Sequence, residues 1–158
     1  VLTHLGQERK ASTTKLAIGG GRDYPVDAAG QDAFAASLAR TTGISRDRAD
    51  ILAYRYGTRA RAIADAEAAA GPGRIDGADR YSVAEITWIC NHERVTRLED
   101  IVLRRTLMAF EGAVTMKGLE DIAAIMRPIL GWTTKQAVNE VGSTAALLRD
   151  RHRMKILA

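Results

Sequence analysis

The chain has 158 residues, enough for one ordinary domain that buries roughly two thirds of the surface its unfolded form exposes. Its hydrophobic content of 46% and charged content of 27% are typical of a folded globular protein and exclude a disordered one. The net charge is +4, but the excess lies at the two chain ends, so the sequence does not predict one continuous basic face for nucleic acid.

Two features bear on the cellular setting. No apolar stretch approaches the roughly 18 residues that a bilayer-spanning helix needs, and no signal peptide is recognisable. The single cysteine, Cys90, excludes an internal disulfide and suits a reducing compartment. Because the chain begins with Val1 and not with Met, we expect it to be part of a longer polypeptide.

Residues 1–25 have no periodicity and are predicted to form an irregular linker. Gly19, Gly20 and Gly21 follow one another, and such a run can cradle a phosphate when a strand precedes it and a helix starts directly after it. Here Asp-Tyr-Pro intervenes and no Lys-Ser/Thr pair follows. A linker or a docked tail is the favoured interpretation.

From residue 26 to the end the pattern is helical, and we expect an all-α domain of about seven helices in a compact orthogonal or bundle arrangement. The first helix covers residues 27–41 and stops at Gly43. The second follows the cap residue Ser45 and ends at Gly57.

The third helix is expected to start after Thr58, taken as its cap, and to continue through the alanine-rich residues 60–70. Residues 71–79 contain three glycines, a proline and two aspartates, which makes them the strongest break in the chain.

The next stretch contains two helix starts of the same form. Ser82 with Glu85, and Thr96 with Glu99, both match the capping box, in which a hydroxyl and a glutamate three residues later satisfy free N–H groups reciprocally. The fourth and fifth helices are therefore expected to form a tight pair, with the fifth ending at Gly112.

The remaining helices are marked less strongly. Thr115 is expected to start the sixth, and Pro128 to limit or kink it near its end. After the turn at Gly131, residues 135–154 are predicted to form a long last helix with a basic C-terminal end, where the helix dipole favours cations.

Two charged residues lie on apolar helix faces. Glu93 shares the apolar face of the fourth helix, and Arg105 lies in the middle of the apolar face of the fifth. Because either would be costly to bury alone, we predict a buried Glu93–Arg105 ion pair or a network that includes Glu85. Arg104 is expected on the exposed side with Asp100. A ligand-binding role for Arg105 is the alternative.

No catalytic, cofactor-binding or metal-binding residue can be nominated from the spacing. Cys90 lies on an apolar stripe and is interpreted as an inert core thiol, and Trp88 and Trp132 as packing residues. No zinc site is expected, because the three histidines lack neighbouring ligands at suitable spacing; they are His4, His92 and His152.

A DNA-binding module is an alternative reading. Residues 38–57 have the helix, short turn and helix of a helix-turn-helix motif. Asp47 and Asp50, however, alternate with the basic residues of the second helix and would repel phosphates. Those basic residues are Arg46, Arg48 and Arg55.

At residues 85–106 the chain resembles the C-terminal helical domain of the FAD-dependent (aerobic) glycerol-3-phosphate dehydrogenase and alpha-glycerophosphate oxidase family. The residues that carry this resemblance are Glu93, Thr96, Leu98-Glu99-Asp100, Leu103 and Arg104-Arg105-Thr106. Weaker matches flank them. These are Leu16-Ala17-Ile18 followed by the glycine run, similar to the family's Leu-Pro-Gly-Gly linker but without the proline, then Tyr56-Gly57-Thr58, and Gly131-Trp132. The resemblance extends over residues 16–153.

The resemblance implies an accessory domain, with 1–25 as the linker from an upstream flavin domain and 26–158 as the C-terminal helical domain. The family's Gly-x-Gly-x-x-Gly and Gly-Gly-Lys-x-Thr segments do not occur here. FAD is therefore expected in the full-length protein and not in this chain, and no family catalytic residue is transferred to any position.

The implied parent reaction is the oxidation of sn-glycerol 3-phosphate to dihydroxyacetone phosphate, with electrons passing from reduced FAD to a quinone or to oxygen. The expected partner is the upstream FAD and substrate domain of the same polypeptide. A homo-oligomer and a peripheral contact with the inner face of the cytoplasmic membrane stay open, and no nucleic acid is expected. The expected location is the cytoplasm. A small DNA- or protein-binding helical module is the alternative.

Overall fold

The computed structural model describes residues 3–6, 12–16, 18–71 and 73–156. Within these ranges the structure is all-helical, which confirms the predicted fold class, and contains one isolated antiparallel bridge between Arg74 and Ser82. Six α-helices of 10 to 19 residues form the body: α1 (Ala28–Thr42), α2 (Arg46–Tyr56), α3 (Ala60–Ala70), α4 (Val83–His92), α6 (Met116–Leu130) and α7 (Thr134–His152).

Short helical elements complete the chain. They are the 3-10 turns η1 (Thr3–Leu5) and η2 (Gly57–Arg59), the three-residue α5 (Leu98–Asp100), and η3 (Ile101–Arg105), which is a π-helix. The α5–η3 segment stands where the fifth helix was expected, so "about seven helices" describes the fold closely.

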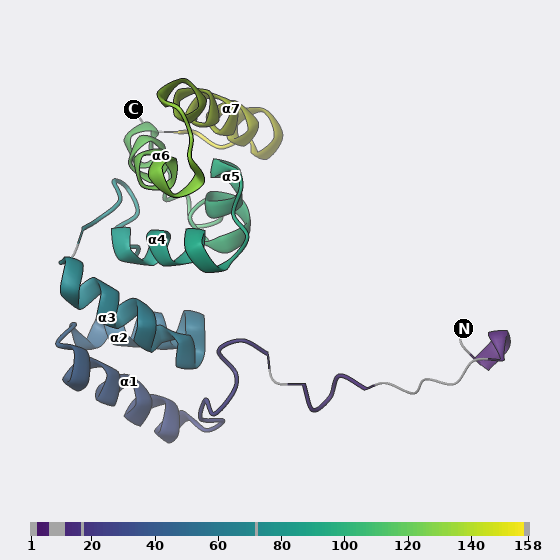
Figure 1. Ribbon diagram of the computed structural model, residues 1–158, viewed down its shortest axis with the longest axis vertical. Coiled ribbons are helices and arrows are strands. Elements are labelled where there is room, and N and C mark those ends of the chain that lie inside the picture. Colours follow the sequence, from purple (N-terminus) through teal and green to yellow (C-terminus); the bar gives the residue numbers. More distant parts are fainter. Residues whose placement is uncertain (1–2, 7–11, 17, 72, 157–158) are drawn as a thin grey trace.

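The helices form two groups that meet along α3 and α4 (Figure 1). The first group contains α1, α2 and α3, and the second contains α4 to α7. The described linker residues 18–25 lie on one side of the first group (Figure 1). None of the helices in the described ranges has both the length and the apolar content that crossing a bilayer requires.

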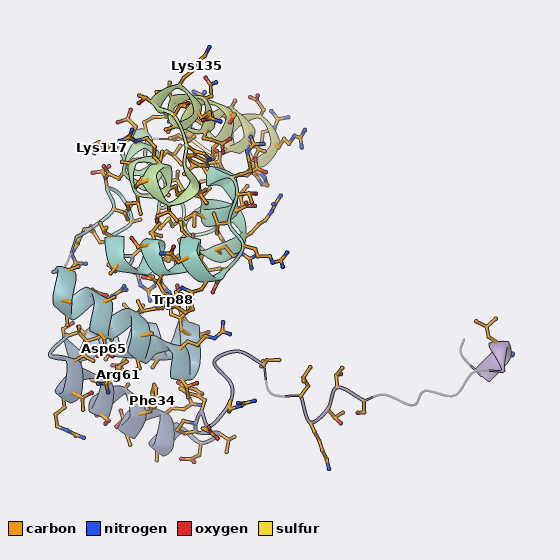
Figure 2. All side chains as sticks on the ribbon, viewed as in Figure 1. Phe34, Arg61, Asp65, Trp88, Lys117 and Lys135 are labelled. Atoms are coloured by element: carbon orange, nitrogen blue, oxygen red, sulfur yellow. The ribbon has the colours of Figure 1, made fainter. Side chains whose placement is uncertain are left out.

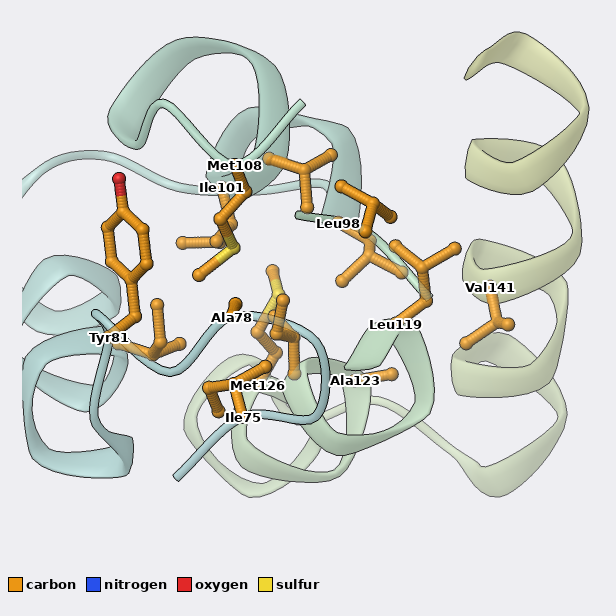
Figure 3. Close-up of a cluster of buried hydrophobic side chains, with 14 of the residues drawn as sticks. Ile75, Ala78, Tyr81, Leu98, Ile101, Met108, Leu119, Ala123, Met126 and Val141 are labelled. Carbon is orange, nitrogen blue, oxygen red and sulfur yellow. The ribbon is translucent and has the colours of Figure 1, made fainter. Parts of the chain in front are cut away.

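Each group has its own hydrophobic core. The first is built on small side chains and on Leu38, Leu52 and Ile63. The second is larger and gathers residues from the 73–82 loop and from α4 to α7 (Figure 3); its fully buried members include Tyr81, Ile86, Ile101, Met108, Leu119 and Met126. Tyr56 and Trp88 pack against both cores, and Trp88 lies on α4 at the boundary between the groups (Figure 2).

Most of the expected helix starts are present. Asp27 accepts a hydrogen bond from the Gly30 amide at 2.8 Å, and four hydroxyl side chains cap their helices in the same way. These are Ser45, Ser82, Thr115 and Thr133. The last helix begins one residue earlier and ends two residues earlier than the predicted 135–154. Pro128 lies inside α6, which ends two residues later at Leu130.

Two of the predicted caps are wrong. Thr96 does not pair with Glu99: the Asp100 carboxylate accepts hydrogen bonds from the amides of Thr96 and Arg97, at 3.0 and 2.9 Å, and so starts α5 itself. Thr58 does not cap α3, because it lies inside η2 and its hydroxyl donates to the linker. At α5 the carboxylate of Asp100 takes the place expected for Glu99, and at α3 the linker takes the Thr58 hydroxyl.

The fifth helix is also shorter than predicted. The π-helix η3 ends at Arg105, and the Thr106 amide donates to the Ile101 carbonyl at 3.0 Å, five residues back. Residues 106–112 then form bends and turns, so the helix does not continue to Gly112. A π-turn bonds i to i+5, so side chains after Ile101 no longer follow the 100° spacing of an α-helix.

The linker is docked where α2 meets α3. The Gly20 carbonyl accepts hydrogen bonds from the Thr58 amide at 3.0 Å and from the Thr58 hydroxyl at 3.3 Å. Gly57 has a positive φ of 55°, and a Cβ there would lie 2.1 Å from the Gly20 carbonyl oxygen. Tyr24 then packs edge-on against Phe34 of α1. Glycine is thus required on both sides of this close backbone contact.

Candidate functional site

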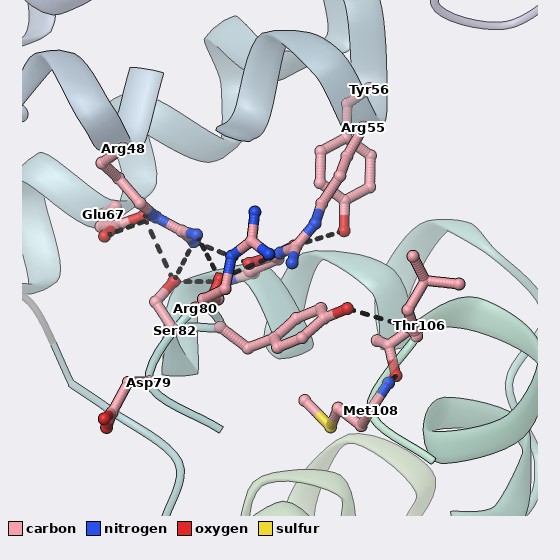
Figure 4. A network of polar contacts seen from close by, with 12 residues as sticks. Arg48, Arg55, Tyr56, Glu67, Asp79, Arg80, Ser82, Thr106 and Met108 are labelled. Carbon is pink, nitrogen blue, oxygen red and sulfur yellow. Dashed lines mark hydrogen bonds and ion pairs between the residues drawn. The ribbon is translucent and has the colours of Figure 1, made fainter. Parts of the chain in front are cut away.

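The most concentrated polar cluster in the described residues surrounds Glu85, whose side chain is completely buried (Figure 4). Its two carboxylate oxygens accept hydrogen bonds from Arg48 at 2.7 Å, Arg55 at 3.0 Å and the Tyr56 hydroxyl at 2.6 Å. All three donors belong to α2, and Glu85 belongs to the first turn of α4. The contact therefore joins the two helical groups.

Arg48 continues the cluster toward α3. Its guanidinium donates to Glu67 at 2.9 Å, to the Ser82 hydroxyl at 3.1 Å and to the Arg80 carbonyl at 2.7 Å. Arg55 donates to the same Arg80 carbonyl at 2.9 Å. The 73–82 loop is therefore fixed by both arginines.

Aromatic rings close the other side of the cluster. The Arg55 guanidinium lies 3.8 Å from the centre of the Tyr81 ring, a cation–π contact. The Tyr81 hydroxyl accepts a hydrogen bond from the Leu107 amide at 2.9 Å, which connects the cluster to the turns after η3 (Figure 4).

Local sequence places these side chains. Arg48 and Arg55 are seven residues apart on α2, two turns, and Leu52 between them is fully buried, so all three share the face that meets α4. Glu85 is the third residue of α4, where the helix dipole favours a negative charge. Ser82 caps this helix through its hydroxyl, but Glu85 does not complete the predicted capping box, because its carboxylate is engaged by α2.

The electrostatics keep the cluster in one ionic form. Burial raises the pKa of the Tyr56 hydroxyl, and the charge and hydrogen bond of Glu85 raise it further. Burial lowers the pKa of Arg48, but Glu85 and Glu67 outweigh burial and raise it. Tyr56 therefore stays protonated and Arg48 stays charged at neutral pH. The cluster is suited to holding two helical groups together and not to proton transfer.

Two of the three basic side chains that were considered for DNA binding take part in this cluster. Arg48 and Arg55 point inward, with side chains 11% and 13% exposed, and Arg46 pairs with Asp50 and with Asp32. Arg48 and Arg55 therefore face an internal contact, whereas Arg46 stays 41% exposed.

The predicted Glu93–Arg105 pair is formed, but the prediction of its burial is wrong. The closest nitrogen and oxygen are 3.9 Å apart, and the Arg105 side chain is 40% exposed. The cause is the π-turn, which rotates Arg105 away from the apolar face. The prediction also allowed a network that includes Glu85. Glu85 does belong to an ion-pair network, but its basic partners are Arg48 and Arg55 and not Arg105.

Arg104 is exposed, as predicted, and donates to Asp100 at 2.6 Å. Asp100 itself is 6% exposed, which the sequence interpretation missed. Burial raises the pKa of this carboxyl, but the Thr96 and Arg97 amides and the Arg104 guanidinium outweigh burial and lower it below its usual value.

The other candidate side chains have structural surroundings. Cys90 is buried in the larger core, and burial raises the pKa of its thiol to about 11. His92 stacks on Trp88 with ring centres 4.5 Å apart, and Trp132 packs against the larger core. In the described ranges, no three His, Cys, Asp or Glu side chains lie together as metal ligands would.

The glycine run does not form a cofactor cradle in this chain. The Gly20 carbonyl accepts the hydrogen bond from the Thr58 amide, and Pro25 and Asp27 separate the run from the first helix. The described residues also contain no strand–turn–helix unit in which a dinucleotide pyrophosphate would be held. They do not fit FAD.

Sequence comparison identifies the family. A comparison with curated proteins found no significant match. The sequence model of the C-terminal domain of alpha-glycerophosphate oxidase, in contrast, matches residues 11–137, which include most of the linker and all helices from α1 to α6. This range overlaps the resemblance to the same family over residues 16–137, and it does not reach residues 138–153. The chain belongs to the family of C-terminal domains of alpha-glycerophosphate oxidase.

Proposed function

We propose that this chain is the C-terminal accessory domain of an FAD-dependent glycerol-3-phosphate dehydrogenase or oxidase. The full-length protein would oxidise sn-glycerol 3-phosphate to dihydroxyacetone phosphate and pass electrons from reduced FAD to a quinone or oxygen. The chain itself supplies no catalytic residue in this proposal. The observation that carries it is the family match over residues 11–137.

The docked linker supports this role. The match begins within the linker, and Gly20 and Gly57 are in close contact where the linker reaches the helices. A fixed linker would hold a preceding domain at one place on the helical body. FAD and the substrate would be bound by that preceding domain, since the residues described here do not fit the cofactor.

The proposed partner is the upstream FAD and substrate domain of the same polypeptide, and a homo-oligomer is a second possibility that the proposal allows. The proposed location is the cytoplasm, with or without a peripheral contact at the inner face of the membrane. The basic end of α7 would favour acidic lipid headgroups in that case; its cations are Arg149, Arg151, Arg153 and Lys155. No nucleic acid is proposed as a partner.

The test is to express the complete coding sequence and the 158-residue chain separately. The complete protein should be yellow, with a flavin absorption spectrum that glycerol 3-phosphate bleaches under anaerobic conditions. The 158-residue chain should be colourless and should show no salt-dependent retention on DNA. A complete protein that lacks flavin, or whose flavin is not reduced by glycerol 3-phosphate, would contradict the proposal.

A further inference from the structure

The outer side of the α6 and α7 pair is hollowed and largely apolar. These two helices pack against each other at the end of the molecule opposite α1 (Figure 1). A cavity of about 430 Å³ lies between them, which we call the α6–α7 groove. Val138 in this groove is 66% exposed, although it is large enough to favour burial. The apolar lining consists of Ala123, Ala124, Ala137, Val138 and Val141.

Two opposite charges lie on one face of α6 at this groove. Glu120 and Arg127 both line the groove and are both exposed, and they share a face because seven residues make two turns of an α-helix. They are about 10 Å apart along the helix axis, too far to pair with each other. Among the described residues, the ion pair on α6 is Lys117–Asp121 and includes neither of them.

Between these two charges the surface of α6 is made of small side chains. Ala123 and Ala124 are the residues midway between Glu120 and Arg127, and both line the groove. Ala123 is buried and Ala124 is exposed, so no long side chain projects from this part of the helix. Because the distance between packed helices depends on the side chains at their contact, another helix can approach α6 closely here.

The charge pattern of this face is complementary to itself. In a two-fold contact, if one residue meets a second residue of the other copy, the second meets the first in the same way. When two copies of α6 lie antiparallel with Ala123 and Ala124 at the two-fold axis, Glu120 of each copy lies opposite Arg127 of the other. A parallel arrangement would instead place Glu120 against Glu120 and Arg127 against Arg127, which repel. The charges therefore select the antiparallel arrangement.

We propose that the α6–α7 groove is an interface between two copies of this chain, formed by antiparallel contact of their α6 helices. Val138 of α7 is then covered by α6 of the other copy, and the α6 and α7 helices of both copies together form a four-helix bundle. The alanines and valines supply the apolar contact, and two Glu120–Arg127 pairs set its direction and register. This inference rests on the surface of the chain and not on the proposed reaction.

The test is sedimentation velocity of the complete polypeptide and its charge-reversed variants over a range of concentrations. Glu120→Arg and Arg127→Glu each place like charges at both contact points, so each variant alone should dimerise at least about tenfold more weakly than the wild type. An equal mixture of the two variants should regain the wild-type affinity, because every mixed dimer again has two pairs of opposite charge. Arg40→Glu, an exposed change on α1, is the control and should leave dimerisation unchanged. Thermal melting followed by circular dichroism shows that each variant is folded.

Each outcome decides for or against this interface. A wild-type polypeptide that stays monomeric at all concentrations would overturn the inference. A dimer that neither reversal weakens would overturn it as well, because that dimer would use another surface. Two weakened variants whose mixture does not recover would show that Glu120 and Arg127 do not face each other, and this result also overturns it. Recovery in the mixture, with no effect of Arg40→Glu, would establish the contact.

Discussion

Glu85 joins the two helical groups through three donors of one helix. A fully buried carboxylate is tolerated only when its charge and lone pairs are satisfied, and Arg48, Arg55 and Tyr56 do this. No buried side-chain nitrogen or oxygen in the described residues lacks a hydrogen-bond partner. The cluster is complete, so the loss of any one member leaves others unpaired.

Glu85→Ala should therefore be strongly destabilising. It leaves the nearly buried Arg55 guanidinium without its carboxylate and Arg48 with Glu67 alone, and we expect a loss of about 3 kcal/mol in the free energy of unfolding. Asp65→Ala is the control, because it removes an exposed pair with Arg61 and should cost less than about 1 kcal/mol. Urea denaturation followed by circular dichroism measures both. Similar costs for the two variants would contradict a structural role for the cluster.

The sequence predicted that Glu85 could belong to an ion-pair network, but not that its partners are Arg48 and Arg55. Ser82 and Glu85 match a local capping motif, and a local motif does not show that Glu85 binds Arg48, 37 residues away. A usable signal was present on α2, where Arg48 and Arg55 share a face with the buried Leu52. The same kind of pattern gives the wrong face for Arg105, because an α-helical wheel does not describe a π-turn.

At the scale of single elements, α5 and η3 differ most from the sequence prediction. The Asp100 carboxylate caps the start of the short helix α5, and α5 passes directly into the π-helix η3, which ends at Arg105. Helix existence and most caps were predictable, since hydroxyl caps, αL glycines and apolar spacing are local. Where α5 starts and where η3 ends depend on packing against distant residues, such as Tyr81 bonding the Leu107 amide.

Asp100→Asn should lower stability in a pH-dependent way. The folded pKa of Asp100 lies below its ordinary value of 3.8, so the carboxylate stabilises the fold above that pH and loses this effect as the pH falls through the folded value. We expect the variant to be about 1–2 kcal/mol less stable at pH 7, with a smaller difference at pH 3. Urea titrations at both pH values test this. A pH-independent difference would show that the charge of Asp100 is not involved.

The contact between the linker and the helices can be tested with two glycine variants. Gly57→Ala and Gly43→Ala both place a side chain at positive φ, 55° and 80°. Gly43 lies in the αL region, where this costs about 1 kcal/mol, whereas Gly57 has a ψ of −132°, lies outside that region and should cost more. Only at Gly57 would the new Cβ also meet the Gly20 carbonyl, at 2.1 Å, whereas Gly43 has no atom within 4 Å. Gly57→Ala should therefore also release the linker, measured as faster trypsin cleavage after Arg22. Equal cleavage in both variants would contradict the docked linker.

At the scale of the whole molecule, the domain is two small cores joined at one boundary. Tyr56 and Trp88 are partly buried residues that pack against both cores, and the Glu85 cluster lies beside them. The overall helical fold follows from composition and periodicity. The division into two groups does not, because it depends on which apolar faces meet across the 71–82 segment.

Tyr56→Ala should weaken the coupling between the two groups. It removes a ring that contacts both cores and a donor to Glu85, and we expect a loss of about 3 kcal/mol together with separate unfolding transitions by tryptophan fluorescence and by far-ultraviolet circular dichroism. In the 158-residue chain, Tyr54→Ala should change stability by less than about 0.5 kcal/mol, because Tyr54 is 89% exposed. Coincident transitions in Tyr56→Ala would show that the groups unfold as one unit without this ring.

The division of the Glu85 cluster between the groups also limits how such domains can be recombined. Arg48, Arg55 and Glu67 come from the first group, and Ser82 and Glu85 from the second. A hybrid that joined residues 26–70 of this chain to the remainder of a relative would set two inward-facing arginines against whatever residue the relative has at position 85. Hybrids whose second part has an acid at that position should therefore be more stable than hybrids that lack one.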